Sequence, residues 1–195
     1  PLKLRFNESF DSPVLEDPLE VLDSPESITL LTGPLKIKLL KGSLRLFEYV
    51  WLDRNRDGVF ADDESISEGQ TARLELRTPD GTIFRADSNV SDWRIEQSGP
   101  QRACLRMEGD HTGPSGKRFR YVVRLHAFRG QPFVRLHYTF INNNKPVLMS
   151  RIKSLELVFP FHKRSGPIEV LLDGSRSLGT RLLQIDDRQF TINGQ

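Results

Sequence analysis

The chain has 195 residues, of which 37% are hydrophobic, and it carries 28 lysines and arginines against 26 aspartates and glutamates. This length corresponds to one domain, or to two small ones at most, and the ordinary globular composition excludes wholesale disorder. No run of about 18 apolar residues occurs, so a membrane-spanning helix is excluded. The single cysteine, Cys104, excludes a disulfide framework within one chain and is expected to be a small buried side chain.

The formal net charge of +2 conceals a division between the two halves of the chain. Residues 1–100 hold 12 basic and 19 acidic residues, a balance of −7, whereas residues 101–195 hold 16 basic and 7 acidic residues, a balance of +9. The sequence therefore predicts a strongly basic surface in its second half. Such a surface suits an anionic partner, whether a polyuronate, a phosphate or a membrane surface.

Residues 1–27 are acidic and are interrupted by Pro13, Pro18 and Pro25, which predicts an extended proline-rich arm or linker. Beyond them, short strand-like segments follow one another with turn signals between them. The predicted strands are Leu35–Lys41, Leu44–Leu52, Thr71–Arg77, Ile83–Ala86, Trp93–Gln97, Arg102–Glu108, Arg118–Phe128, Phe133–Ile141, Ile152–Phe159, Ile168–Leu172, Arg181–Ile185 and Phe190–Ile192.

No segment keeps a helical period over three turns, although Leu44–Leu52 fits one helical face as well as a strand. The sequence thus predicts an all-β fold, an antiparallel β-sandwich of about a dozen strands formed by residues 28–195. Because the chain begins at Pro1 without a methionine, we expect this domain to be a fragment of a larger protein.

The most informative hairpin joins Arg118–Phe128 to Phe133–Ile141 through a four-residue loop. With Phe128 opposite Phe133, the period of two gives the ribbon one apolar and one basic face. The basic face consists of Arg118, Arg120, Arg124, His126, Arg135 and His137. Because guanidinium groups clamp carboxylates, this basic face is a candidate surface for an acidic glycan or for docking a catalytic domain. The alternative is a solvent face whose arginines pair with carboxylates on a neighbouring strand, such as Glu108 or Glu156.

Residues Asp53–Glu64 match the twelve-residue calcium loop, with oxygen-bearing side chains at positions 1, 3 and 5, glycine at position 6 and glutamate at position 12. The expected ligands are Asp53, Asn55, Asp57, the Val59 carbonyl and Glu64. The flanking residues do not favour helices, so we expect an isolated calcium loop between strands. A solvated acidic loop is the alternative, and Asp62 or Asp63 could replace Glu64 as the closing ligand.

Other residues give weaker signals. His111 lies between Gly109 and Gly113 and is expected in a surface loop. Trp51 and Trp93 are expected to fill the core, with stacking on sugar rings as the alternative. No phosphate loop, zinc spacing or assignable nucleophile triad is present. Nucleic acid is not an expected partner, because the aromatic residues of the basic hairpin fall on its apolar face.

Several motifs carry a resemblance to a known family: Thr32–Ile37, Ile95–Ala103, Met107–His111, Tyr121–Gln131, Val134–Phe140 and Leu182–Asp187. Together they resemble the central β-sandwich domain of the exo-acting rhamnogalacturonan lyase family, over roughly residues 28–190. In that family a small N-terminal barrel precedes the sandwich and a helical toroid follows it. The resemblance implies an exported, extracellular or periplasmic polysaccharide lyase-like parent that degrades rhamnogalacturonan or pectin. It implies that the toroid supplies most of the β-elimination machinery, and no catalytic residue is assigned in this chain.

Three functions follow as hypotheses. The first is a noncatalytic, calcium-stabilised module whose partners are an acidic polysaccharide or oligosaccharide and the neighbouring domains of the parent chain. The second is a structural or protein-interaction sandwich without sugar binding. The third is a small stand-alone uronate lyase, in which His126 or His137 abstracts a proton beside a carboxylate neutralised by Arg124 or Arg135.

Overall fold

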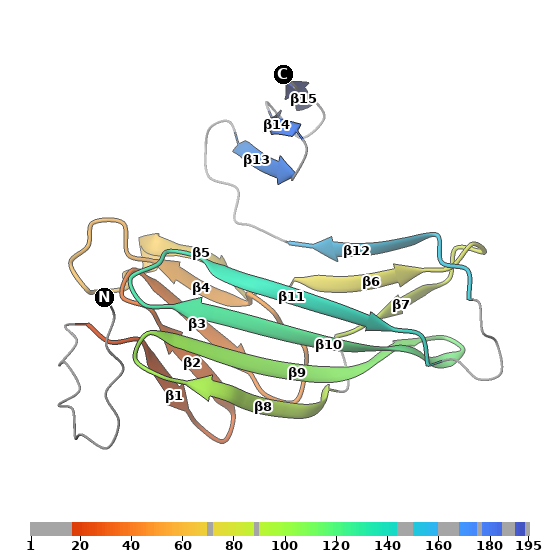
Figure 1. The fold of residues 1–195 in the computed structure, drawn as a ribbon, viewed down its shortest axis with the longest axis horizontal. Coiled ribbons are helices and arrows are strands. Elements are labelled where there is room, and N and C mark those ends of the chain that lie inside the picture. The colour runs from red at the N-terminus through yellow and green to blue at the C-terminus, as the bar shows by residue number, and fades with distance from the viewer. Residues whose placement is uncertain are drawn as a thin grey trace, which may run out of the picture. The chain divides into compact units, whose positions relative to one another are not determined.

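The computed structural model describes residues 17–69, 72–87, 90–143 and 150–159, and the backbone of three strands between residues 168 and 193. The chain divides into two compact units, residues 1–161 and 162–195. Apart from one short 3-10 helix, Asp62–Glu64, every regular element in the described part is a β-strand (Figure 1). No helix in these stretches has the length and apolar character needed to cross a membrane.

The first sheet of the larger unit has five antiparallel strands in the order β1-β2-β3-β4-β5. Their bounds are β1 Glu20–Asp23, β2 Ser27–Leu31, β3 Leu35–Leu40, β4 Tyr49–Leu52 and β5 Ser65–Glu68. Strand β1 lies inside the range predicted as an arm. It pairs with β2 alone, and an edge strand of this kind tolerates flanking prolines such as Pro18 and Pro25, which had suggested irregular structure.

The second sheet has seven strands, in the order β11-β10-β9-β7-β6-β12, with β8 also pairing with β9. Their bounds are β6 Arg73–Arg77, β7 Ile83–Arg85, β8 Val90–Ser98, β9 Arg102–Gly113, β10 Gly116–Phe128, β11 Val134–Ile141 and β12 Ser154–Val158. Strands β9 and β10 form a long hairpin at the centre of this sheet (Figure 1). Strand β12 ends the sheet and leaves Leu155 and Leu157 39% and 38% exposed.

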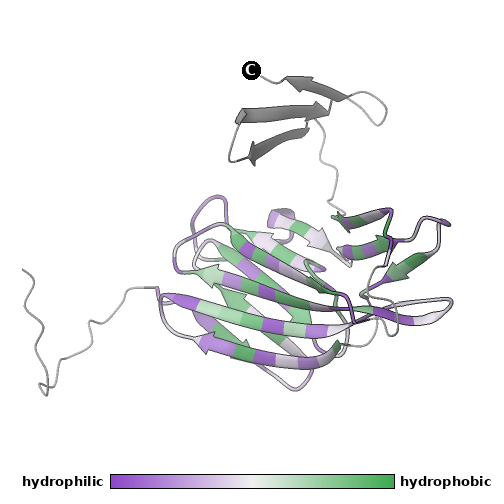
Figure 2. Cartoon of the chain, turned by 45° about the vertical axis from the view of Figure 1, so that its right-hand side comes forward, coloured by the Kyte–Doolittle hydropathy of each residue, from purple (hydrophilic) through white to green (hydrophobic). Residues whose placement is uncertain are grey.

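The inner faces of the two sheets form the core. Alternating residues of β2 and β3, among them Leu30 and Ile37, join Leu105, Met107 and Val123 of the second sheet in one buried cluster. A smaller cluster contains Leu76, Phe84 and Phe119, with Phe140 packed against it. Figure 2 shows the resulting alternation of hydrophobic and hydrophilic residues along the strands. The prediction of an antiparallel β-sandwich is confirmed.

The segment Leu44–Leu52, ambiguous in sequence, forms no helix. Only Tyr49–Leu52 is a strand, and Leu46 makes an isolated bridge to Ala72. Leu44 and Leu46 are buried, and Phe47 has a left-handed φ of 59° that re-aims the chain before β4. The apolar spacing of this segment therefore reflects burial from an irregular connection, which helix and strand periods do not distinguish.

The smaller unit contains three antiparallel strands in the order β13-β14-β15. Their bounds are β13 Ile168–Gly174, β14 Ser177–Gln184 and β15 Phe190–Asn193. The three strands predicted there are confirmed in the backbone, except that Ile185 lies outside the described residues.

One end of the sandwich is held by contacts between loops. The Gly130 N–H donates to the Thr32 carbonyl at 2.6 Å, and the Thr32 hydroxyl donates to the Gln131 carbonyl at 2.8 Å. The β10–β11 loop is thereby fixed to the β2–β3 turn of the other sheet. This attachment fixes the position of the adjacent ends of β10 and β11, which carry part of the predicted basic face.

Candidate functional site

The outer face of β10 and β11 carries most of the predicted basic face. Arg124 lies opposite His137 and His126 lies opposite Arg135, so the predicted hairpin register is confirmed. On the other side of β10, strand β9 places Arg106 opposite Arg124 and Cys104 opposite His126. The sequence did not indicate which strand would border the hairpin, and β9 and β8 add further charged residues to this face.

A β-bulge separates Arg118 from the rest of the basic face. The β9–β10 register shifts between Arg118 and Arg120, and Phe119 has a left-handed φ of 53°. Arg118 consequently lies opposite the inward-facing His111, and its guanidinium carbon is 5.5 Å from the centre of the Phe84 ring. The predicted alternation through Arg118 is therefore wrong at this residue, because the bulge adds one residue to β10 and reverses the facing before it.

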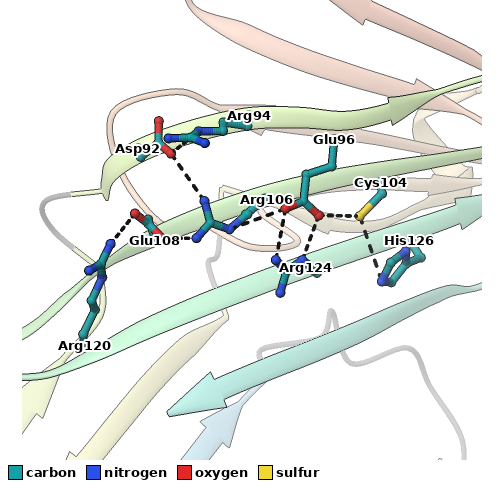
Figure 3. A network of polar contacts seen from close by, with 9 residues as sticks. All are labelled: Asp92, Arg94, Glu96, Cys104, Arg106, Glu108, Arg120, Arg124 and His126. Atoms are coloured by element: carbon teal, nitrogen blue, oxygen red, sulfur yellow. Dashed lines mark hydrogen bonds and ion pairs between the residues drawn. The ribbon is translucent and has the colours of Figure 1, made fainter. Parts of the chain in front are cut away.

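Most of the outer face is an ion-pair network (Figure 3). Arg106 and Arg120 both donate to the buried carboxylate of Glu108. Arg124 donates to the two oxygens of Glu96, from Nε at 2.7 Å and from Nη2 at 3.0 Å. For Arg120 and Arg124, therefore, the alternative interpretation holds: these arginines pair with carboxylates of neighbouring strands. Glu108 was one of the predicted acceptors, whereas Glu96 was not.

Two further carboxylates complete the comparison with the sequence. Asp92 lies 3.6 Å from Arg106 and also pairs with Arg94 on the edge of β8. Glu156, the other predicted acceptor, instead accepts a hydrogen bond from the Ser154 hydroxyl at 2.5 Å. The bonds from Arg124, with the charge of Arg106, lower the pKa of Glu96, which keeps this carboxylate ionised.

The outer face is different at the hairpin end, where we define a cationic cluster formed by Arg102, His126, Arg135 and His137 around the Phe128 ring. The guanidinium carbons of Arg102 and Arg135 lie 5.8 and 5.9 Å from the centre of that ring. The rings of His126 and His137 are 4.9 Å apart. Within the described stretches, neither Arg102 nor Arg135 forms an ion pair with a carboxylate, so this end of the face keeps its positive charge.

His126 is buried and held in one tautomer. Arg102 Nη2 lies 2.9 Å from His126 Nδ1, and because a guanidinium only donates, Nδ1 is the acceptor and Nε2 carries the proton. Burial, followed by the charges of Arg102, His137 and Arg135, lowers the pKa of His126. The neutral imidazole is therefore engaged within the protein, and the exposed His137 is the histidine that a ligand would meet.

Cys104 lies between the network and the cationic cluster. Its Sγ is 3.6 Å from Glu96 Oε2 and 4.0 Å from His126 Nε2 (Figure 3). Burial and the neighbouring Glu96 raise the pKa of the thiol. The expectation of a small buried cysteine is confirmed, and the protonated thiol is a poor nucleophile.

The Asp53–Glu64 loop is closed by the carboxylates at its two ends, which are only 6% and 5% exposed. Asp53 accepts backbone N–H groups from Arg56, Asp57 and Gly58 at 2.6, 3.3 and 2.9 Å. Glu64 accepts those of Arg54 and Ala61 at 2.8 and 3.3 Å. Gly58 has a φ of 79°, which agrees with the glycine expected at position 6 of the loop.

The donor chemistry of this loop fits calcium, since the side chains of Asp53, Asn55, Asp57 and Glu64 all offer oxygen. In the structure these groups are occupied with the chain itself: Asn55 Nδ2 donates to Asp57 at 2.9 Å, and Asp57 accepts the Val59 N–H at 2.7 Å. Across the described stretches, no group of three or more histidine, cysteine, aspartate or glutamate side chains is gathered to hold a metal ion.

His111 is a buried core residue of β9, and the expectation of a surface loop is wrong. Its Nδ1–H donates to the Phe119 carbonyl at 2.7 Å, and its Nε2 accepts the Tyr138 hydroxyl at 2.5 Å. Burial lowers the pKa of His111. The glycines that suggested a loop lie within the strand, where Gly113 leaves room for Phe84: a Cβ at Gly113 would meet that ring at 2.6 Å.

The two tryptophans lie in different places. Trp93 is half-buried and packs against the main core cluster, in agreement with the core expectation. Trp51 is half-buried as well, but among the described residues it belongs to neither core cluster. It lies on the outer face of the first sheet, so the core expectation does not hold for Trp51.

Comparison with protein families identifies the domain. A family model described as "PcRGLX-like protein central beta sandwich domain" matches residues 19–162. No curated protein matches the chain. The matched range begins just before β1 and ends at the boundary of the first compact unit. The chain therefore belongs to the PcRGLX-like family and contains the central β-sandwich domain of a rhamnogalacturonan lyase-like protein.

Proposed function

We propose that this domain is a noncatalytic module that binds acidic glycan through the cationic cluster, in an exported, pectin-degrading parent protein. The observation that carries the proposal is the contrast along one sheet face. Arg120 and Arg124 are satisfied by carboxylates, whereas Arg102 and Arg135 flank Phe128 without a carboxylate partner in the described part of the chain. A polyuronate would supply that partner.

The aromatic residues of the same region suit a sugar. The two guanidinium carbons lie 5.8 and 5.9 Å from the centre of the Phe128 ring, and Phe133, whose ring centre is 6.2 Å from that of Phe128, is 50% exposed. A uronate presents both an ionised carboxylate and a C–H-rich ring face. Guanidinium groups beside the half-buried Phe128 and the exposed Phe133 match both features, whereas a phosphate would use only the charges.

The first test is the removal of the two guanidinium groups that have no carboxylate partner in the described part of the chain. Changing Arg102 and Arg135 together to alanine is expected to weaken binding of oligogalacturonate by more than tenfold, because each charge-assisted contact contributes about 1.5–3 kcal/mol. Isothermal titration calorimetry at low salt measures the effect, since salt screens such contacts. The matched control is Arg124→Ala, which removes an arginine already paired with Glu96 and should change affinity less than about threefold.

The same chain also tests the two alternative functions, the protein-interaction module and the stand-alone lyase. If the unmutated 195-residue chain folds correctly but binds no acidic oligosaccharide, the proposal is contradicted and a protein-interaction module is favoured. Growth of the ultraviolet absorbance of an unsaturated uronide, when the chain alone is mixed with pectic polymers, would contradict the noncatalytic role and favour the stand-alone lyase. His126 is engaged by Arg102, so in that case His137→Gln should remove the activity.

We also propose that calcium binds the Asp53–Glu64 loop through Asp53, Asn55, Asp57, the Val59 carbonyl and Glu64. The all-oxygen donor set and the spacing of the loop support this site. With a Kd of about 0.1 mM, in the range of extracellular modules, 10 mM calcium stabilises by about 2.7 kcal/mol. For a chain of this size, that corresponds to a rise of about 5–10 °C in Tm.

Differential scanning calorimetry with and without calcium measures this rise. Asp57→Asn is the informative variant, because an amide keeps an oxygen for the Val59 N–H but removes a ligand charge. The variant should melt like the parent chain without calcium and lose most of the rise with it. The same change at Asp62 or Asp63 shows whether either residue replaces Glu64. An unchanged Tm of the parent chain at 10 mM calcium would contradict the site.

A further inference from the structure

The outer face of the first sheet carries two adjacent aromatic residues. Tyr49 and Trp51 alternate along β4 with the buried Val50, so they point away from the core. Their ring planes are within 14° of parallel, and their centres are 6.2 Å apart. The register of β3 and β4 places Lys36 opposite Trp51 and Lys38 opposite Tyr49.

A lysine and a third aromatic ring complete this region. Lys36 Nζ lies 4.7 Å from the centre of the Trp51 ring and 5.5 Å from that of Phe60, which belongs to the Asp53–Glu64 loop. We call Lys36, Lys38, Tyr49, Trp51 and Phe60 the aromatic–lysine surface. Each of the five side chains is half-buried, so each retains some contact with solvent.

Apart from the contacts of Lys36 with the Trp51 and Phe60 rings, the polar groups of the aromatic–lysine surface have neither hydrogen-bond nor ion-pair partners among the described residues. Neither the Tyr49 hydroxyl nor the Trp51 indole N–H makes a hydrogen bond there, and neither lysine forms an ion pair. Lys41, near the same sheet, contrasts with them because it pairs with Asp23. Two lysines and two aromatic polar groups are thus available to a ligand beside ring faces that the core does not use.

We propose that the aromatic–lysine surface is a second binding site for an acidic pyranose. The C–H-rich face of the sugar packs on the rings of Trp51 and Tyr49, and the lysines neutralise its carboxylate. The indole N–H and the phenol remain for its hydroxyl groups. The proposal rests on the proposed function for its ligand class, an acidic glycan. Its residues lie on the other sheet, so each site can be tested and contradicted independently of the other.

Charge complementarity decides between an acidic and a neutral sugar. Stacking alone serves any pyranose, but two lysines without carboxylate partners would repel each other less when an anion lies between them. Lys36 Nζ lies over the Trp51 ring, 4.7 Å from its centre. A sugar stacked on that face would displace the amine, and the sugar carboxylate would then replace the ring as its partner. Acidic sugars should therefore bind more tightly than their uncharged esters.

The experiment uses the two tryptophans of the chain. Trp93→Phe leaves Trp51 as the sole source of indole fluorescence, while keeping an aromatic ring against the core. Titration of this variant with trigalacturonic acid should change the intensity or the emission maximum of Trp51 in a saturable way. The trimethyl ester of the same trisaccharide should bind at least fivefold more weakly, and Lys36→Gln should remove most of that preference.

Affinity measured by calorimetry should fall about tenfold in Trp51→Ala, as expected for the loss of one stacked ring. Thermal unfolding of each variant verifies that it folds. The double variant that lacks Arg102 and Arg135 separates the two sites: a persistent Trp51 response in it supports the aromatic–lysine surface even if the cationic cluster proves to be the stronger site.

Three results would overturn the proposal. The first is a Trp51 emission that stays constant at saturating trigalacturonic acid. The second is a response of equal size and affinity for the acid and its ester. If Trp51→Ala lowers Tm without changing any affinity, the surface serves only to hold Phe60 and its loop against the sheet, and the proposal is wrong.

Discussion

A chain in which Glu108 is replaced by alanine is expected to have a free energy of unfolding about 3 kcal/mol below that of the parent chain. The Glu108 side chain is only 8% exposed and accepts from both Arg106 and Arg120. Without Glu108, the largely buried Arg106, which is 18% exposed, loses one of its carboxylate partners. Breaking a buried pair costs about 3–5 kcal/mol. The loss lies at the low end of that range, because Arg106 keeps Asp92 at 3.6 Å and Glu96 at 3.5 Å. Urea denaturation at neutral pH measures the loss.

Glu96→Ala is the matched control for this prediction. Glu96 and its hydrogen-bonded partner Arg124 are 33% and 37% exposed, so water screens their bonds. Arg106, 3.5 Å from Glu96, keeps its bond to Glu108 in this variant, so the expected loss is about 1 kcal/mol or less. The double variant Glu108→Ala with Arg120→Ala should recover part of the loss, because one unpaired charge is then removed. Equal losses in Glu108→Ala and Glu96→Ala would show that burial does not decide the strength of this network.

The second large effect concerns pH. The pKa of His111 is lowered from its ordinary value of 6.5 by burial, whereas in the unfolded chain it returns to that value. Below pH 6.5 the unfolded chain therefore binds more protons than the folded protein. The contribution of His111 to stability is complete above pH 6.5 and is lost as the pH falls toward its lower folded pKa. The slope reaches about 1.4 kcal/mol per pH unit.

Urea denaturation between pH 5 and 8 tests this slope with His111→Gln. A glutamine can donate to the Phe119 carbonyl and accept from Tyr138, but it does not titrate. The variant should therefore have a lower free energy of unfolding than the unmutated chain above pH 7, and this free energy should depend less on pH below pH 7. His126, whose pKa is also lowered, contributes a slope of the same sign that remains in the variant. A variant with the pH dependence of the parent chain would exclude His111 as its source.

The β10–β11 hairpin shows how much of the fold could be predicted. Its strict alternation and short loop fix the register, because a slip by one residue would turn every apolar side chain outward. The bulge at Phe119 could not be predicted in the same way. A left-handed φ at a phenylalanine has no local sequence signal, since glycine and asparagine are the residues that usually mark this conformation.

The candidate site was predictable only in part, for a related reason. The basic residues of one hairpin are recognisable from alternation, but their acidic partners come from β8 and β9, and the identity of a bordering strand is a property of the whole sheet. Arg102 was missed as a member of the cationic cluster because it belongs to β9. Trp51 and Trp93 look alike in sequence, and only the sheet face on which each lies distinguishes them.

The edge strands of the second sheet affect how readily the isolated domain associates with itself. Strand β8 pairs with β9 alone and carries the Asp92–Arg94 pair, and charges on an edge strand discourage pairing with another molecule. The order of the sheet itself ends at β11 and β12: β11 carries the basic Arg135 and His137, whereas β12 leaves Leu155 and Leu157 partly exposed. In concentrated solutions of the isolated domain, self-association is therefore expected to begin at β12, and charged substitutions there are the first choice for improving solubility.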